Sequence, residues 1–141
     1  MPKNIVIVGG GYIAVEFAGI FNALGADVTI IIRANNVLRG FDQTMRDALR
    51  DEMQKKGIKV LSECQVKSIE KSDNGYSLRL DQVDFIEADL VMYATGRAPN
   101  TKGIGLEDAG VEMDKNGAII VDAYSKTSVD SIFAIGDVTD R

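Results

Sequence analysis

A short apolar run that ends in three consecutive glycines constrains the fold of this chain more than any other feature. The run covers residues 4–8 (N-I-V-I-V), and the glycines at 9–11 follow it directly. A β-branched run of this length is typical of a parallel strand that is buried on both faces. Apolar residues then recur at helical spacing over residues 12–24, and Gly25 is placed to end that helix. The apolar face expected of this helix comprises Ile13, Phe17, Ile20, Phe21 and Leu24.

The alternation of strands and helices continues along the chain. Residues 27–32 (D-V-T-I-I-I) form a second buried run, and residues 58–61 form a third. Between them Asp42 can cap a second helix, which Gly57 ends. Strand, helix, strand, helix and strand with short connections predict a parallel sheet wound with helices. The apolar face expected of the second helix comprises Met45, Ala48, Leu49 and Met53.

A different pattern follows the third strand. Residues 65–69, 76–80 and 83–87 are short runs of alternating polarity, and the turn-forming residues 72–75 (S-D-N-G) join the first two. They predict an antiparallel meander. Residues 90–94 form a further apolar run, which we expect to return to the parallel sheet.

The segment 97–100 (R-A-P-N) is the expected domain boundary, because proline and asparagine interrupt regular structure there. The chain is therefore expected to divide into residues 1–97 and residues 98–141. The second part is expected to hold a hairpin and then a strand that ends in Gly-Asp, in residues 111–121 and 131–137 respectively.

The glycines fit a motif with a specific chemistry, Gly9-x-Gly11-x-x-Ala14, in which Gly10 fills the first open position. The first glycine permits a tight turn from strand to helix, and the second lets the backbone approach a pyrophosphate. Ala14 is small enough for the helix to pack closely on the strand. The helix N-terminus then offers free N–H groups to the phosphates. The motif predicts an α/β, Rossmann-like dinucleotide-binding domain with an inserted antiparallel β-meander, followed by a short β-rich segment.

The end of the second strand indicates which dinucleotide binds. An NAD site places an acidic residue there to accept a hydrogen bond from the ribose 2′-OH, but this chain has Ile32. Arg33 follows at once and Arg39 six residues later, with no acidic residue in 28–41. Because two guanidinium groups can clamp a 2′-phosphate, NADP is the expected cofactor.

Three further residues are candidates for the site, and for two of them the pattern leaves alternatives open. Tyr12 stands at the helix start, where the cofactor would pass. Glu16, one turn further on, caps a backbone group, accepts a hydrogen bond from a carboxamide, or is a solvated helix residue. Asp137 either binds a ligand hydroxyl at a strand end or is a turn residue.

Composition narrows the partners and the chemistry. The net charge of -5 argues against nucleic acid and anionic membranes as partners. We expect no secretory signal and a cytoplasmic location. With no histidine and a single cysteine, Cys64, the chain holds no paired-thiol redox centre, and no metal site is expected. Cys64 is interpreted as a packing residue.

The chain resembles the pyridine nucleotide-disulfide oxidoreductases, which are FAD flavoproteins, and among them the glutathione reductases. The resemblance covers essentially the whole chain. The segments that carry it are G-G-G-Y-I-A-V-E-F-A-G-I-F-N (9–22), V-L-R-G-F-D (37–42), A-T-G-R-A-P-N-T-K (94–102), N-G-A-I-I-V-D-A-Y-S-K-T-S-V (116–129) and I-F-A-I-G-D-V-T-D-R (132–141).

The resemblance implies roles for individual residues. Arg33 and Arg39 fall where glutathione reductases bind the 2′-phosphate. Tyr12 falls on a tyrosine that covers the flavin, and Gly96 lies in a loop that closes over the cofactor. Asp137 matches an aspartate that holds FAD. Two more residues fall on positions that line the nicotinamide end of the site, Ile13 and Glu16.

The resemblance also implies what a longer parent enzyme would add. In this family an N-terminal segment carries the main FAD site and the redox cysteines, and a C-terminal domain supplies a catalytic histidine and the homodimer contact. Residues 98–141 would be a returning part of the FAD domain. The parent is expected to pass electrons from NADPH through FAD to glutathione disulfide, while this chain alone is expected to be inactive. The alternatives are a trypanothione, mercuric or dihydrolipoamide enzyme, or a stand-alone NADPH-binding module.

Overall fold

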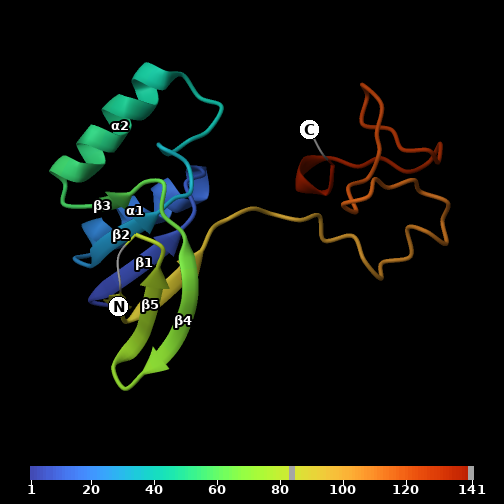
Figure 1. The fold of residues 1–141 in the computed structure, drawn as a ribbon. Helices are drawn as coiled ribbons and strands as arrows, with labels where there is room; N and C mark the ends of the chain where they lie inside the picture. Colours follow the sequence, from blue (N-terminus) through green and yellow to red (C-terminus); the bar gives the residue numbers. More distant parts are fainter. Residues whose placement is uncertain (83–84, 140–141) are drawn as a thin grey trace. The chain divides into compact units, whose positions relative to one another are not determined.

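The computed structural model describes residues 1–82 and 85–139, which form two compact units, Met1–Gly96 and Arg97–Arg141. Every strand and α-helix of the described residues lies in the first unit (Figure 1). In chain order the elements are β1 (Asn4–Val8), α1 (Tyr12–Ala23), β2 (Asp27–Ile31), α2 (Gln43–Lys55), β3 (Lys59–Leu61), β4 (Val66–Ser72), β5 (Gly75–Leu80), β6 (Ile86–Ala88), β7 (Leu90–Tyr93) and the short 3-10 helix η1 (Gly136–Val138).

The first sheet is parallel, with the strand order β3-β2-β1-β7. β1 lies in the middle and pairs with β2 from Asn4 opposite Asp27 onward. On its other side β1 pairs in parallel with β7, from Ile5 opposite Leu90 onward. The predicted return of residues 90–94 to the parallel sheet is therefore confirmed.

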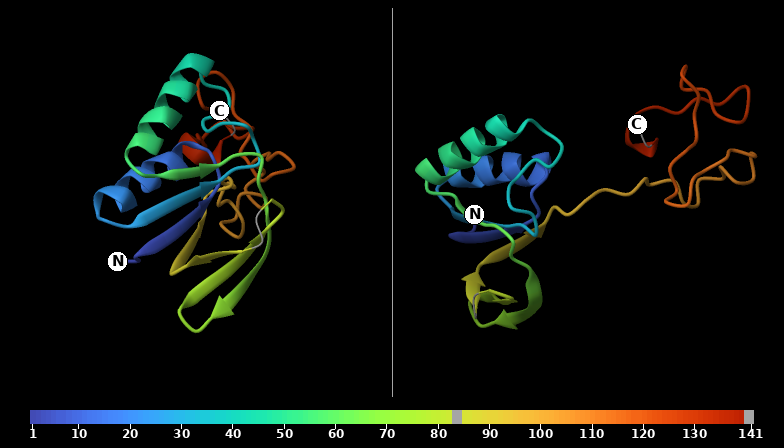
Figure 2. Two further views of the ribbon diagram at one scale, coloured as in Figure 1. Left: turned by 60° about the vertical axis from the view of Figure 1, so that its left-hand side comes forward. Right: turned by 45° about the horizontal axis from the view of Figure 1, so that its top comes forward.

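The parallel sheet is covered on both faces, as its apolar strands predict. Because side chains alternate along β1, Ile5 and Ile7 join the core on the helix side, whereas Val6 joins a second core beneath the meander. The two helices lie on one face of the sheet and the antiparallel strands β4, β5 and β6 on the opposite face (Figure 2). Of the third predicted meander strand, residues 83 and 84 lie outside the described part, and β6 covers Ile86–Ala88.

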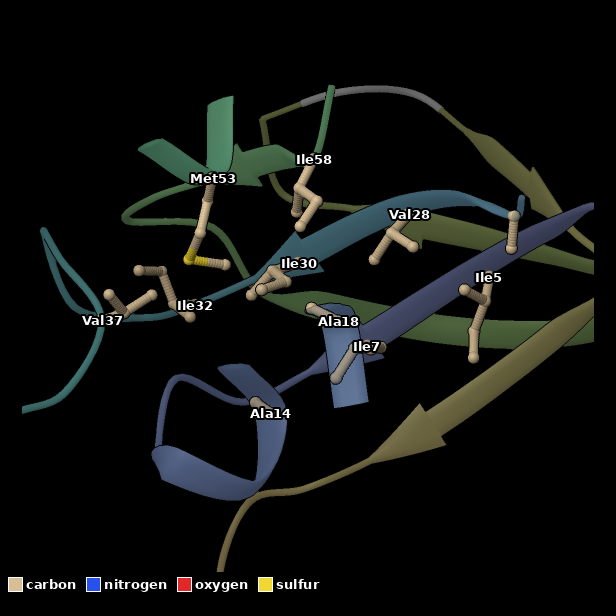
Figure 3. Close-up of a cluster of buried hydrophobic side chains, with 11 residues drawn as sticks. Ile5, Ile7, Ala14, Ala18, Val28, Ile30, Ile32, Val37, Met53 and Ile58 are labelled. Atoms are coloured by element: carbon tan, nitrogen blue, oxygen red, sulfur yellow. The ribbon is translucent and has the colours of Figure 1, made fainter. Parts of the chain in front are cut away.

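Small residues of α1 face the sheet. Ala14 and Ala18 are fully buried and point at the strands (Figure 3), whereas Phe17, Ile20 and Leu24 are 40%, 50% and 58% exposed. The large-residue face predicted for this helix was therefore largely wrong. A helix that approaches a sheet closely leaves no room for large side chains at the contact, and only alanine fits there.

The beginning of α2 also differs from the apolar face predicted for it. Met53 is buried and Leu49 packs on the same core, but Met45 is 67% exposed and Ala48 is exposed. The first turns of this helix instead present polar side chains to the preceding loop. Asp42 caps the helix by accepting a hydrogen bond from the Met45 N–H at 3.1 Å, as predicted. None of the helices in the described residues could cross a membrane, since they are too short or too polar.

The second unit lacks the regular strands predicted for it, within the residues described. The predicted hairpin is reduced to a single bridge between Met113 and Ile119. The predicted strand 131–137 is likewise replaced by one bridge, Lys126 with Phe133, followed by η1. A strand needs a continuous partner, and the backbone here bonds to turns instead, as when Ala134 N–H donates to Ser125 at 3.0 Å.

Candidate dinucleotide-binding site

Three loops begin at the same edge of the parallel sheet. The register places Val8 opposite both Ile31 and Tyr93, so β1, β2 and β7 end side by side. The loops that follow these strands comprise residues 9–11, 32–42 and 94–96. Because ligands of wound α/β sheets bind outside the carboxyl ends of the strands, this edge is where a dinucleotide is expected.

Gly9 connects the ends of these three strands, and no other residue fits at its position. Its φ is +134°, a backbone conformation that only glycine adopts readily. Its N–H donates to the Ile31 carbonyl at 2.9 Å, and a Cβ at this position would overlap the carbonyl oxygen of Ala94. The first glycine of the motif is thus required by the sheet itself.

Gly10 and Gly11 face different surroundings. A Cβ on Gly10 would lie 2.8 Å from the Ile32 Cγ2, whereas a Cβ on Gly11 would meet nothing within 4 Å. Gly11 is the N-cap of α1, and within the described residues no side chain caps this helix and none in its first turn is acidic. The helix N–H groups therefore border open space next to a glycine, which suits the approach of a pyrophosphate.

The other residues of this helix end differ in their exposure. Tyr12 is 52% exposed, and Glu16 is exposed one turn further along α1. Ile13 is half-buried, and Ala14 is buried against the strands. Gly96, also exposed, lies two residues after Ala94, the residue that contacts Gly9.

Arg33 and Arg39 lie in the loop between β2 and α2, coloured cyan in Figure 1. Both side chains are exposed, and neither donates a hydrogen bond or forms an ion pair within the described residues. The loop is joined to the glycine turn because the Leu38 N–H donates to the Gly10 carbonyl at 2.7 Å. Two free guanidinium groups therefore accompany the glycine turn in one connected loop system.

Sequence reasoning missed the residues that hold this loop. Asn36 is buried, 3% exposed, and donates to Asp47 of α2, and Arg46 of the same helix binds the loop backbone. The available signal was the polar spacing on α2, where residues at i, i+3, i+4 and i+7 lie on one face: Gln43, Arg46, Asp47 and Arg50.

Asp137 belongs to the second unit, Arg97–Arg141. It lies in η1, and its exposed carboxylate forms an ion pair with Arg97. The role predicted for Asp137 therefore rests on the resemblance and not on the geometry of the glycine turn. Within the described residues no group of side chains could hold a metal ion.

Cys64 is buried beneath the parallel sheet, where it packs with Leu78 in the second core. Burial, and then a hydrogen bond with the Asp81 carboxylate, raises the pKa of the thiol above its usual value. Its environment is that of an inert packing residue and not of a reactive thiolate.

The four-stranded parallel sheet, its two covered faces and the glycine turn at its carboxyl edge define a Rossmann-type α/β protein. The chain belongs to the pyridine nucleotide-disulphide oxidoreductase family, whose model matches residues 1–141.

Curated relatives cover the chain along its whole length. It is 51% identical over 140 residues to a glutathione reductase of Burkholderia cepacia, covering 99% of this chain and 31% of that protein. It is 39% identical over 141 residues to a dihydrolipoyl dehydrogenase of Staphylococcus aureus, covering 98% of this chain and 30% of that protein. The chain thus spans about a third of the length of these relatives.

Solved structures share the fold. The flavoprotein disulfide reductase RclA of Escherichia coli matches with a TM-score of 0.89 and 33% identity over 98% of this chain and 32% of its own. An engineered water-forming NADPH oxidase bound to NADPH matches with a TM-score of 0.84 and 34% identity over 98% of this chain and 30% of its own. It is a mutant of a water-forming NADH oxidase from Lactobacillus brevis, which, bound to NADH, matches with a TM-score of 0.83 and 32% identity over 98% and 30%.

Proposed function

We propose that this chain is the NADPH-binding portion of a flavin-dependent disulfide reductase that acts on glutathione disulfide. The observation that carries the cofactor assignment is the pair of free guanidinium groups, Arg33 and Arg39, beside the glycine turn. Ile32, buried directly after β2, offers no carboxylate to a ribose 2′-OH. A 2′-phosphate would meet two unpaired cations here, and the residue after the strand would carry no negative charge to repel it.

The engineered oxidase supports this assignment through the spacing of its substitutions. In that protein an aspartate is replaced by alanine, the next residue by arginine, and the residue six positions after this arginine by a second arginine. A glycine 18 positions before the aspartate is replaced by alanine. Ala14, Ile32, Arg33 and Arg39 stand at the same spacing here. The protein with these substitutions is an NADPH oxidase, and the protein without them is an NADH oxidase.

The residues at the sheet edge fit a bound dinucleotide. The open space at Gly11 and the uncapped N-terminus of α1 would hold the pyrophosphate, and the two arginines the 2′-phosphate. Tyr12, Ile13 and Glu16, on the following turn of α1, would then line the nicotinamide half. NADPH, when bound, supplies a hydride, and the role of these side chains is to orient the ring that carries it.

The proposals for the substrate and the flavin apply to the whole parent protein and not to this chain alone. The higher identity to a glutathione reductase, 51% against 39% for a dihydrolipoyl dehydrogenase, supports glutathione disulfide as the substrate. The flavoprotein relative supports FAD, for which Asp137 of the second unit is the proposed contact. Because the only cysteine of the chain is buried and the chain has no histidine, we assign disulfide exchange to other parts of the parent protein. That parent is proposed to be a homodimer in the cytoplasm.

Calorimetric titration with NADPH and NADH tests the cofactor assignment. We expect the chain to bind NADPH more tightly, and Arg33→Ala and Arg39→Ala each to weaken NADPH binding by about 10-fold to 100-fold, the value of a hydrogen bond to a charged group. NADH binding should hardly change, because it has no 2′-phosphate.

Arg79→Ala is the matched control, since Arg79 is an exposed arginine of β5 in the meander. This variant removes the same charge from the other face of the sheet, and its NADPH affinity should equal that of the unchanged chain. Equal affinity of the unchanged chain for NADPH and NADH would refute the NADP assignment.

A further inference from the structure

A buried asparagine holds the loop that carries both arginines. The Asn36 side chain, 3% exposed, uses both ends of its amide. Its Oδ1 accepts from the Val37 N–H at 2.9 Å, and its Nδ2 donates to the Asp47 Oδ1 of α2 at 2.7 Å. The same carboxylate oxygen accepts from the Gln43 Nε2 at 2.9 Å. Asn36 therefore links the loop backbone to a helix whose own side chains orient the acceptor.

Arg46 holds the same stretch of backbone from the other side. Its Nε donates to the Val37 carbonyl at 2.7 Å, one of its terminal nitrogens donates to the Asn36 carbonyl at 3.4 Å, and the other to the Gln43 Oε1 at 2.8 Å. Both the N–H and the carbonyl of Val37 are thus bonded to side chains, and its own side chain is fully buried beside Ile32 and Met53 (Figure 3). The backbone between Arg33 and Arg39 is fixed at its middle.

We propose that Asn36, through Asp47, is a positioning residue for 2′-phosphate recognition and so sets the preference for NADPH over NADH. The inference rests on the proposed function, because it concerns how Arg33 and Arg39 are presented to that phosphate. Both arginines are exposed and bonded to no described residue, so their own side chains do not determine where they lie. The loop backbone determines it, and the side chains that anchor this backbone to α2 are Asn36, Arg46 and Arg50, the last by donating to the Asn35 carbonyl at 3.5 Å.

The effect should be selective for one dinucleotide. The pyrophosphate is expected at Gly11 and the α1 N-terminus, and the Asn36 side chain bonds to Val37 and Asp47 and to neither of these. Removal of the Asn36 amide leaves the buried Val37 N–H without its acceptor and detaches the loop from Asp47. The backbone that carries the two arginines then loses its Asn36 anchor, whereas the NADH contacts stay in place.

The test is the ratio of NADPH to NADH affinity in Asn36→Ala. We expect NADPH binding to weaken by about tenfold, the equivalent of one charge-assisted hydrogen bond, with NADH binding changed by less than about twofold. Asn22→Ala is the matched control, because Asn22 lies near the far end of α1 and its side chain bonds to no described residue. A merely structural role would weaken the binding of both dinucleotides together and leave their ratio unchanged.

Two further variants separate positioning from direct contact. In a chain that already carries Arg33→Ala and Arg39→Ala, Asn36→Ala should cause no further loss of NADPH affinity, because it acts through those side chains. The double variant Asn36→Asp with Asp47→Asn restores an amide-to-carboxylate hydrogen bond in the reverse direction and should recover most of the preference for NADPH. Asn36→Asp alone places two carboxylates together and should not recover it.

The outcomes distinguish the two proposals. No preference for NADPH in the unchanged chain would refute the proposed function and this inference with it. A clear preference for NADPH in the unchanged chain that Asn36→Ala leaves intact would refute the positioning role only.

Discussion

The glycine turn allows folding and ligand binding to be separated by two substitutions of the same kind, Gly9→Ala and Gly11→Ala. At Gly9 an alanine must adopt a φ of +134° and overlap the carbonyl oxygen of Ala94. Such backbone strain costs about 1–3 kcal/mol by itself, before β1 and β7 move apart to relieve the overlap. We therefore expect Gly9→Ala to lower the free energy of unfolding by more than about 3 kcal/mol, a large share of a typical 5–15 kcal/mol.

Gly11→Ala should have the opposite profile. Its φ of -77° suits alanine, and the new methyl group meets nothing within 4 Å. Alanine is a poorer N-cap than glycine by about 0.5–1 kcal/mol, but it also stiffens the unfolded chain by a similar amount. The fold should be nearly unaffected, whereas the methyl group enters the space expected for the pyrophosphate and should weaken NADPH and NADH alike by roughly tenfold or more.

Thermal unfolding followed by circular dichroism, with dinucleotide titration of each variant that folds, measures both effects. For a unit of this size the Gly9→Ala loss corresponds to a midpoint lower by roughly 10–20 °C, against a few degrees for Gly11→Ala. Gly10→Ala should fall between them, because its Cβ would lie 2.8 Å from the Ile32 Cγ2 but its backbone does not require a positive φ. Unchanged dinucleotide binding in Gly11→Ala would refute the assignment of this turn to the pyrophosphate.

Two predictions concern ionisable groups away from the site. The buried Cys64 thiol, whose pKa is raised by burial, should react with a disulfide reagent at pH 8 far more slowly in the folded chain than in urea, followed by absorbance; equal rates would contradict its burial. The Asp114 carboxylate accepts from the Ala118 N–H at 2.8 Å, which holds its pKa below the usual value, so its stabilising effect is present at neutral pH and lost as the pH falls below about 4. The Ala118 amide signal in NMR should move over that range, and Asp114→Asn should abolish the movement.

The parts of the fold that the sequence predicted are those determined by local pattern. β1, β2 and β7 are short, mostly apolar runs, and each occupies the parallel sheet as predicted. Asp42 caps α2 because capping depends on a few adjacent residues. The contact face of α1 could not be predicted in this way, because hydrophobicity favours Phe17 and Ile20 while the closeness of helix and sheet selects Ala14 and Ala18. That closeness is a property of the packed structure.

The second unit shows a second feature that local sequence pattern does not predict, namely whether an apolar run finds a pairing partner. The apolar residues at 131–137 read as a strand, but a strand forms only where a partner pairs with it along its length. Here Ile135 and Phe133 are 78% and 61% exposed, and the segment makes one bridge before the turn at Gly136. The apolar pattern of a segment indicates that it could form a strand with one buried face. It does not indicate whether a second strand is present to pair with it.

The same reasoning explains why the sequence predicted the two arginines but not Asn36, which holds their loop. Arg33 and Arg39 stand at fixed distances from a recognisable motif, whereas Asn36 acts through residues of α2 that lie 7 to 11 positions away. The loop that carries the arginines is also bonded directly to the glycine turn, from the Leu38 N–H to the Gly10 carbonyl at 2.7 Å. Leu38 adopts a φ of +52° to make that bond, a conformation that costs a leucine about 1–2 kcal/mol. Val37 beside it is buried and bonded at both its N–H and its carbonyl, so one short backbone segment connects the loop of the two arginines to the glycine turn. Because residues 36–38 bond both to α2 and to Gly10, the backbone sets where Arg33 and Arg39 begin relative to the glycine turn, while their unbonded side chains are left to reach a phosphate.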